Sequence, residues 1–365
     1  MSEAERVATL LAYEFLREGK FSAAHGPVEV RSLVVAAAAA EGNVEQGAVS
    51  EEAANFPSVA VQSVGFEEGP QNPAVHIYLT KGSAKTIKAL PKLVEGVPVR
   101  AHKMGNVVVR PDAAASASNH GHLFEKNGRI ACGSSCAPTS ENLSGTLGAL
   151  VRAAGSHQLY ILSNNHVLAG CNHVPLDQPI LSPSSADGKP SLRAPGEIAR
   201  HERIHELRSG SPNFVNPCDA DLALARATDP TILSSWQGDA NGYDTPAASL
   251  EPKSGMRVKK FGRTTALTHG LVEARVIAPM PVGYTSSHFK GTVWFTNVWT
   301  VRGVNGAFAL PGDSGSLVVS EDGAHSVGVV FAANPGGEYG WIIPMPCVLQ
   351  SFGGLRLVSN HGAAP

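Results

Sequence analysis

From about residue 130 onward, the chain consists of short apolar runs separated by glycine, proline and asparagine. The runs are too short for ordinary helices and lack a 3.6-residue period, so they predict β-strands joined by turns. The composition agrees, because 38 glycines and 25 prolines make 63 of the 365 residues, about 17 % against a usual ~12 %. Regularly spaced strands without intervening helices predict one mainly β domain, a barrel or sandwich, over residues 130–365.

Several strands of this domain can be placed individually. Residues 146–151 and 157–162 predict a hairpin across a turn at residues 154–156. Further strands are expected at residues 222–225, 257–261, 270–276, 293–301, 317–319 and 327–331.

Residues 1–110 predict a small α+β region. The segment 2–18 carries Val7, Leu11 and Phe15 at helical spacing, and Ser2 with Glu5 matches a capping box. A helix of this kind binds a partner or, more usually, packs on its own protein. Strands are expected at residues 74–79 and 97–100, with a helical or irregular segment at 85–93 between them.

The boundary of this region is marked by composition. Residues 111–129 begin with the small, polar stretch PDAAASASN, which is typical of a linker. Residues 20–72 show only weak periodicity, and no organisation is predicted for them. The expected division is therefore an N-terminal region (1–110), a linker (111–129) and a β domain (130–365).

Charge and apolar runs exclude some classes of partner. The net charge is −2, so no electrostatic argument favours nucleic acid or an anionic membrane. The longest apolar run, residues 33–40, falls short of the ~20 residues that a membrane span needs, and residues 2–5 contain no basic export signal. Five cysteines, an odd and small number, are typical of free thiols, so we expect a cytoplasmic protein.

One cysteine pair and one cysteine–histidine pair could together be imagined as a zinc site. Cys132 and Cys136 are four apart, and Cys171 lies two before His173, but this spacing matches no standard zinc finger or ribbon. No metal and no organic cofactor are expected.

Three segments of the β domain carry residues suited to acyl transfer. His166 follows an apolar strand, Asp221 opens an apolar run, and Ser314 lies in a glycine-flanked turn before a strand. Serine is a weak nucleophile that needs a base, and a carboxylate fixes the tautomer of a histidine base. The glycines allow a tight turn in which the amides of Gly312 and Ser314 are expected to bind an oxyanion.

Each segment taken alone is ordinary. Most of the 14 histidines must be packing or surface residues, an aspartate before a strand is usually a cap, and GDSG occurs by chance as a turn. Together, in the order His, Asp, Ser and all at strand ends, they form a specific pattern.

The segments LYILSNNHVLAGCN (159–172), GRTTALTHG (262–270) and LPGDSGSLV (310–318) resemble trypsin-like serine proteases of the chymotrypsin fold. They are most similar to an intracellular branch that includes bacterial trypsin-like proteins and plant narrow-leaf proteases. The resemblance spans about residues 74–346, because VHIYL…VEGVPVR also matches the segment before the protease. It implies two β-barrels with the catalytic groups in the cleft between them.

The resemblance gives His166 the role of general base, Asp221 that of orienting acid and Ser314 that of nucleophile. Asp219 is an alternative acid. Asp221-Leu222-Ala223-Leu224 follows the family pattern, whereas starting from Asp219 would bury Asp221 as a second, unpaired charge.

One departure concerns activation. Secreted relatives pair a new N-terminus with the acid that precedes the serine, here Asp313, but Arg129-Ile130 resembles such a cleavage site only faintly. The intracellular branch implies instead that internal groups satisfy Asp313 without cleavage. No catalytic reason is found for GRTTALTHG, which predicts a strand with a tight turn.

Phe308, six residues before the serine, occupies the position that sets primary specificity in this family. A phenyl ring cannot neutralise Lys or Arg. With Ala332 and Ala333 on the wall strand, it predicts a shallow pocket for small or medium apolar side chains, although Glu338 could also reach this pocket.

The sequence therefore predicts a mainly β, chymotrypsin-like double β-barrel behind an α+β region, acting as an intracellular serine endopeptidase. Its partner would be a protein or peptide substrate, with a co-expressed effector as one candidate, and a homo-oligomer is compatible with the sequence. A catalytically silent protease-fold scaffold and a serine esterase are the alternatives.

Overall fold

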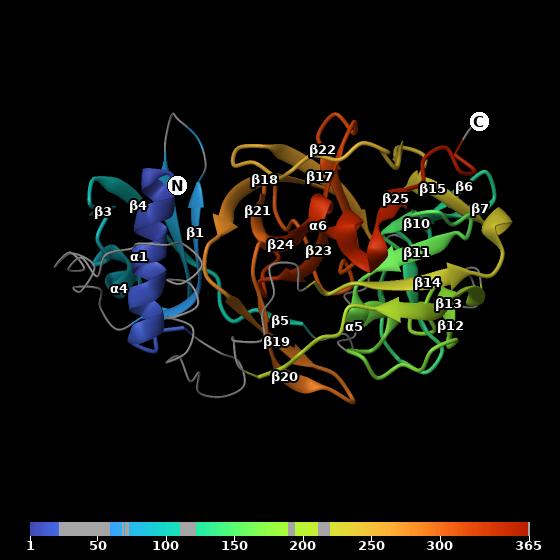
Figure 1. Ribbon diagram of the computed structural model, residues 1–365, viewed down its shortest axis with the longest axis horizontal. Coiled ribbons are helices and arrows are strands. Elements are labelled where there is room, and N and C mark those ends of the chain that lie inside the picture. Colours follow the sequence, from blue (N-terminus) through green and yellow to red (C-terminus); the bar gives the residue numbers. More distant parts are fainter. Residues whose placement is uncertain are drawn as a thin grey trace.

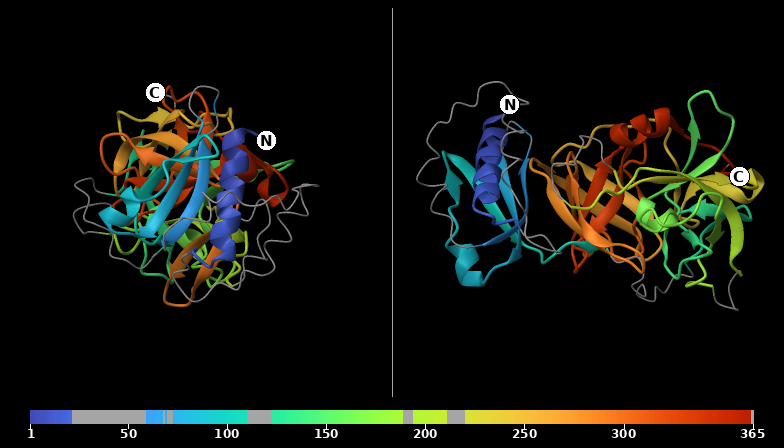
Figure 2. Two further views of the ribbon diagram at one scale, coloured as in Figure 1. Left: turned by 90° about the vertical axis from the view of Figure 1, so that its left-hand side faces the viewer. Right: turned by 60° about the horizontal axis from the view of Figure 1, so that its bottom comes forward.

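The computed structural model describes residues 1–21, 59–67, 69, 73–109, 122–188, 194–210 and 220–363. Three units built mainly from strands follow one another along the long axis of the molecule (Figures 1 and 2). A helix covers a small sheet at one end, a barrel lies in the middle, and a second set of curled strands forms the other end. No helix within the described residues has both the length and the apolar character needed to cross a membrane.

Helix α1 (Glu3–Arg17) begins with the predicted capping box, in which Ser2 and Glu5 each accept from the other's backbone amide. Its apolar stripe, with Val7, Leu11 and Phe15 fully buried, packs on the N-terminal sheet. The helix therefore packs on its own protein.

The N-terminal sheet consists of β1 (Ala60–Glu67), β2 (Ala74–Lys81), β4 (Val97–Lys103) and the short β3 (Leu93–Val94). Strands β1 and β2 are antiparallel, whereas β2 and β4 are parallel and are linked through α4 (Ala84–Lys88). The predicted strands are confirmed, and the expected segment 85–93 contains only a short helix.

This sheet continues into the middle barrel, because β1 pairs with β18 at Gly65 and Phe66. A Cβ on Gly65 would lie 2.9 Å from the carbonyl oxygen of Arg275, so only glycine allows the two strands to approach this closely.

The middle unit is a closed six-stranded antiparallel barrel with strand order β17-β22-β23-β24-β21-β18, closed by pairing between β17 and β18. Its strands are β17 (Arg257–Gly262), β18 (Ala266–Val276), β21 (Trp299–Gly303), β22 (Leu317–Ser320), β23 (Ser326–Ala333) and β24 (Tyr339–Pro344).

A hairpin of β19 (Met280–Thr285) and β20 (Lys290–Phe295) extends from this barrel, and β5 (Val108–Val109) pairs in parallel with β19. The prediction of one continuous strand over residues 293–301 is wrong. The chain forms β20 and β21 instead, because Asn297 between them adopts a left-handed conformation with φ of 54°, which interrupts an extended strand.

The far unit is an eight-stranded sheet with the order β25-β10-β11-β14-β13-β12-β8-β9, joined by a four-stranded sheet with the order β16-β15-β7-β6. The predicted hairpin of residues 146–162 is present as β10 paired with β11. The elements of this unit and of the C-terminus are β6 (Glu125–Lys126), β7 (Arg129–Cys132), β8 (Ser135–Pro138), β9 (Gly145–Thr146), β10 (Ala149–Ala153), β11 (Tyr160–Ser163), α5 (Asn165–Leu168), β12 (Pro179–Ser182), β13 (Gly196–Ile204), β14 (Ala223–Ala227), η2 (Pro230–Ile232), β15 (Leu233–Gln237), β16 (Tyr243–Asp244), α6 (Met345–Gln350), η3 (Ser351–Gly353) and β25 (Leu355–Leu357).

The strand pairing confirms the predicted fold class: a mainly β, double-barrel architecture behind a small α+β unit. The far end of the segment expected to be a linker contributes to the β domain, since β6 and the first residue of β7 lie within residues 122–129.

Candidate active site

His166 belongs to the short helix α5, which follows β11 in the chain. Figure 1 shows α5 on the side of the far unit that faces the middle barrel. The His166 side chain is only 2 % exposed. The two asparagines before it brace the turn: the Asn164 amide donates to the carbonyl of Asp221 at 2.6 Å, and the Asn165 amide donates to the carbonyl of His205 at 2.6 Å. The two asparagines thus anchor the turn before His166 to Asp221 and His205.

Asp221 is completely buried and binds His166 twice. Its Oδ1 accepts from the His166 backbone amide at 3.1 Å, and its Oδ2 accepts from His166 Nδ1. A proton on Nδ1 leaves the lone pair of a neutral imidazole on Nε2, the tautomer that a general base needs. Asp219, the alternative acid, lies outside the described residues.

Tyr284 also belongs to this pair, although its sequence context gave no sign of it. It lies on β19, and its hydroxyl donates to Asp221 Oδ2 at 2.8 Å. Burial, together with the neighbouring Asp221 carboxylate, raises the pKa of Tyr284 well above its ordinary value, so the phenol stays a neutral donor. A residue from the middle unit therefore holds the carboxylate that orients a histidine of the far unit.

Ser314 lies in a turn that contacts the strand leading to His166. Its carbonyl accepts from the Thr146 amide at 2.9 Å, and the next residue, Gly315, has a φ of +94°. A Cβ on Gly315 would lie 2.1 Å from Ser163 Oγ, three residues before His166, so the turn is packed directly against this strand. Among the described residues, no hydrogen bond joins Ser314 Oγ to the imidazole.

Gly312 has a φ of +98°, and a Cβ there would lie 2.4 Å from Thr264 Oγ1. Its carbonyl accepts from Thr146 Oγ1 at 2.8 Å, which turns this peptide group towards the far unit. Within the described part of the chain, the backbone amides of Gly312 and Ser314 have no hydrogen-bond acceptor. Two neighbouring amide donors are thus available to an oxygen atom beside Ser314.

Asp313, between these two residues, is fully buried and accepts four hydrogen bonds. The donors are the amides of Thr264, Thr265 and Leu310, at 2.8, 3.1 and 2.9 Å, and the Thr265 hydroxyl at 2.7 Å. Lys260 Nζ lies 3.5 Å away. As expected, internal groups satisfy Asp313, and the GRTTALTHG motif, for which no catalytic reason was found, contains the tight turn that supplies three of the four donors.

Lys260 is itself fully buried within the barrel. Its ammonium donates to Thr265 Oγ1 at 2.8 Å and lies 5.7 Å from the centre of the Phe308 ring. Burial lowers the pKa of Lys260, and the Asp313 carboxylate opposes that shift. A buried cation without its counter-charge would be strongly unfavourable, so the two side chains depend on each other.

A second buried ion pair joins the two barrel units beside this turn. The Arg263 guanidinium forms a two-pronged contact with Asp187, whose Oδ2 also accepts from Ser135 Oγ at 2.6 Å. Burial opposes ionisation of Asp187, but the hydrogen bonds from Arg263 and Ser135 lower its pKa to about 2. Arg263 is the first residue of the turn between β17 and β18 in the middle unit, and Asp187 belongs to the far unit.

The predicted pocket residues occupy two different core clusters. Phe308 is fully buried between Gly270 and Gly340, where an added Cβ would lie 2.8 and 2.9 Å from the ring, and Ala333 packs against the same cluster. Ala332 belongs instead to the cluster shared by the two barrel units, and Glu338 is exposed.

Among the described residues, the cysteines do not come together as a group of metal ligands. The one group of three possible metal ligands in this part of the chain consists of His76, His102 and Glu273. Cys132 and Cys136 are buried, and burial raises the pKa of both thiols well above their usual range.

No protein-family model and no curated protein sequence matches the chain. Among solved structures, the chain is similar to Thermobifida fusca protease A, at 19 % identity and a TM-score of 0.43, over 63 % of this chain and all of that one. A Nocardiopsis protease is 21 % identical with a TM-score of 0.41, over 59 % of this chain and 92 % of that one. A Cellulomonas bogoriensis chymotrypsin is 18 % identical with a TM-score of 0.41, over 63 % and 98 %. The assignment of the double β-barrel rests on the strand pairing described above.

The Lys260–Asp313 pair yields a stability prediction. Lys260→Met removes the cation and leaves a buried carboxylate, so we expect the free energy of unfolding to fall by about 3–5 kcal/mol in urea denaturation. Lys259→Met on the same strand is the control, because that side chain is half-buried and lies over the Tyr243 ring. Equal losses in the two variants would show that the ion pair does not stabilise the barrel.

Proposed function

We propose that this protein is a serine endopeptidase that cleaves protein or peptide substrates through Ser314, His166 and Asp221. The observation that carries the proposal is the buried, doubly hydrogen-bonded His166–Asp221 pair beside the turn that holds Ser314. The three residues come from separate parts of the sequence, and hydrogen bonds between the two β-units link the segments that carry them, which supports the proposal.

In the proposed reaction, Ser314 Oγ attacks the carbonyl carbon of the scissile peptide while His166 Nε2 takes the hydroxyl proton. The imidazolium is stabilised by Asp221 and returns the proton to the leaving amine as the C–N bond breaks. Water then attacks the Ser314 ester with His166 again as base, which releases the carboxylate product and restores the serine.

The negative oxygen of each tetrahedral intermediate would accept from the amides of Gly312 and Ser314. Two observations support this role: both amides lack an acceptor within the described residues, and Asp313 between them is fixed by four donors. Donors that are already oriented need no reorganisation when charge develops. Hydrogen bonds between nucleophile and base are often loose without substrate, so the separation of Ser314 from the imidazole is compatible with this mechanism.

We also propose a cytoplasmic location, on the basis of the odd and small number of cysteines. The substrate would be a protein encountered there.

The first test is covalent labelling of Ser314. A fluorophosphonate probe should phosphonylate Ser314 Oγ with loss of fluoride, and Ser314→Ala should remain unlabelled, as measured by intact-protein mass spectrometry. Ser316→Ala is the matched control, because that serine lies in the same turn and donates to the Asp313 carbonyl. Folded wild-type protein that takes up no label would favour a silent scaffold, and cleavage of esters but not of peptides would identify an esterase.

The second test distinguishes the two candidate acids. Asp221→Asn should slow labelling of Ser314 by about 10⁴-fold, because the amide favours the wrong histidine tautomer. Asp219→Asn should label at nearly the wild-type rate. Circular dichroism checks that both variants are folded, and a larger loss in Asp219→Asn would transfer the role of orienting acid to Asp219.

The third test concerns the residue before the cleaved bond. A substrate side chain next to the Phe308 region would meet apolar walls, so Lys and Arg would lose water without gaining a carboxylate, and we expect a preference of at least ~100-fold for apolar residues. A peptide library analysed by mass spectrometry measures this ratio. Cleavage mainly after Lys or Arg would refute it, and Glu338→Gln would then show whether that carboxylate confers the basic preference.

A further inference from the structure

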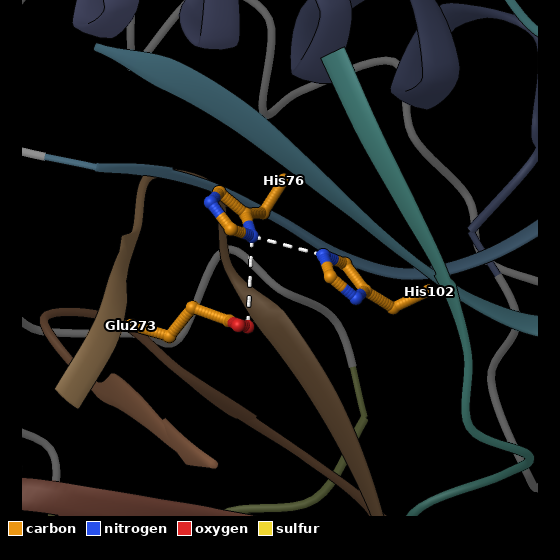
Figure 3. Close-up of side chains that lie close together, drawn as sticks. All are labelled: His76, His102 and Glu273. Atoms are coloured by element: carbon orange, nitrogen blue, oxygen red, sulfur yellow. Dashed lines mark hydrogen bonds and ion pairs between the residues drawn. The ribbon is translucent and has the colours of Figure 1, made fainter. Parts of the chain in front are cut away.

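A cluster of polar side chains lies between the N-terminal sheet and the middle barrel, with His76 buried and His102 half-buried. His76 on β2 and His102 on β4 point towards Glu273 on β18 (Figure 3). His76 Nδ1 is 2.9 Å from His102 Nε2 and 3.5 Å from Glu273 Oε2, and all three atoms lie within 4.8 Å of one another. The two imidazole rings are stacked, with their planes 2° apart.

Two atoms about 2.1 Å from a tetrahedral ion are roughly 3.4 Å apart. The observed separations of 2.9 and 3.5 Å are close to that value, so small side-chain rotations would bring the three atoms around one ion.

The outer hydrogen bonds of both imidazoles suit metal ligands. His76 Nε2 lies 3.4 Å from Glu67 Oε2, which can accept a proton carried on Nε2, and a neutral His76 of that tautomer has its lone pair on Nδ1. His102 Nδ1 lies 3.0 Å from the Tyr339 hydroxyl, which accepts when His102 carries its proton on Nδ1. In these tautomers the two lone pairs lie on atoms 2.9 Å apart beside the Glu273 carboxylate, an arrangement that a bound cation stabilises. Ligating histidines commonly have such a second partner.

The carboxylate of the cluster is also held in place. Glu273 Oε2 accepts from Tyr78 at 2.8 Å, and Oε1 accepts from Arg302 at 3.1 Å. The cluster thus combines a carboxylate with two nitrogen donors.

We propose that His76 Nδ1, His102 Nε2 and Glu273 Oε2 bind one divalent transition-metal ion of the zinc type, with a fourth position open to water. Two imidazoles and one carboxylate form a donor set that suits zinc and cobalt better than the all-oxygen set that calcium and magnesium prefer. Since two ligands belong to the N-terminal sheet and one to the barrel, the ion links these units. Its role is structural and separate from the reaction at Ser314.

Cobalt(II) titration of the EDTA-treated full-length protein tests the proposal. We expect one ion per chain, visible absorption of tetrahedral intensity, release of protons on binding, and displacement by zinc. His102→Gln and Glu273→Gln should each weaken binding at least ~100-fold, and Tyr339→Phe, which removes only the outer hydrogen bond, about 10–100-fold. Tyr339→Phe keeps the test valid if the ligand variants fail to fold.

The matched control is His269→Gln. That histidine lies 2.9 Å from Glu321, so it forms a histidine–carboxylate pair but belongs to no three-ligand group among the described residues. Its loss should leave cobalt affinity unchanged. The proposal would be overturned if folded wild-type protein gave no tetrahedral cobalt spectrum. It would also be overturned if Tyr339→Phe bound cobalt as tightly as the wild type and the ligand variants kept the wild-type spectrum.

Discussion

The side chain of Asp313, which has no exposed surface, lies at the centre of the turn that holds Ser314. Asp313 accepts from the backbone of the β17–β18 turn and lies near a buried ammonium group, Lys260. A buried charge of this kind is tolerated only when its partners are in place, so the turn at residues 310–316 has one favourable conformation. The amides of Gly312 and Ser314, which have no acceptor among the described residues, flank the residue that is fixed in this way.

Around this turn, hydrogen bonds join the two barrel units, and each unit contributes side chains that bind the other. Thr146 of the far unit binds the carbonyls of both Gly312 and Ser314, and Tyr284 of the middle unit binds Asp221 of the far unit. The Arg263–Asp187 pair adds a buried ionic link between the units. These bonds link the segment that carries the histidine–aspartate pair to the turn that holds Ser314, and the proposed reaction would need that link because a misplacement of about 1 Å can slow catalysis ~100-fold.

The N-terminal unit is attached to the barrel by two different kinds of contact. Backbone pairing of β1 with β18 depends on the missing side chain of Gly65. Beside this pairing, His76, His102 and Glu273 form a polar cluster within the interface. Polar groups buried at an interface stabilise it only when all are satisfied.

Local patterns in the sequence were sufficient for many of the strands, for the capped helix and for the residues of the SNNH and GDSG segments, but they did not predict β1, β13 or β19. Those signals act over a few residues: strand runs bounded by turns, a capping box, and glycines where φ is positive. The sequence also predicted that Asp313 has internal partners, but it did not say that the GRTT turn and Lys260 are those partners. It left residues 293–301 as one strand, because the left-handed conformation of Asn297 is not apparent from an apolar pattern.

Tertiary structure alone decided which distant side chains meet. Tyr284 with Asp221, Arg263 with Asp187, and His76 with Glu273 are each separated by 63 residues or more along the chain. Such contacts depend on strand register and on how the sheets curl, and a register slip of one residue would turn strand residues such as Tyr284, His76 and Glu273 to the opposite face. The sequence by itself determined the kind of fold and the residues suited to acyl transfer. The packing of three β-units determined their partners, because only closed, registered sheets bring these groups within hydrogen-bonding distance.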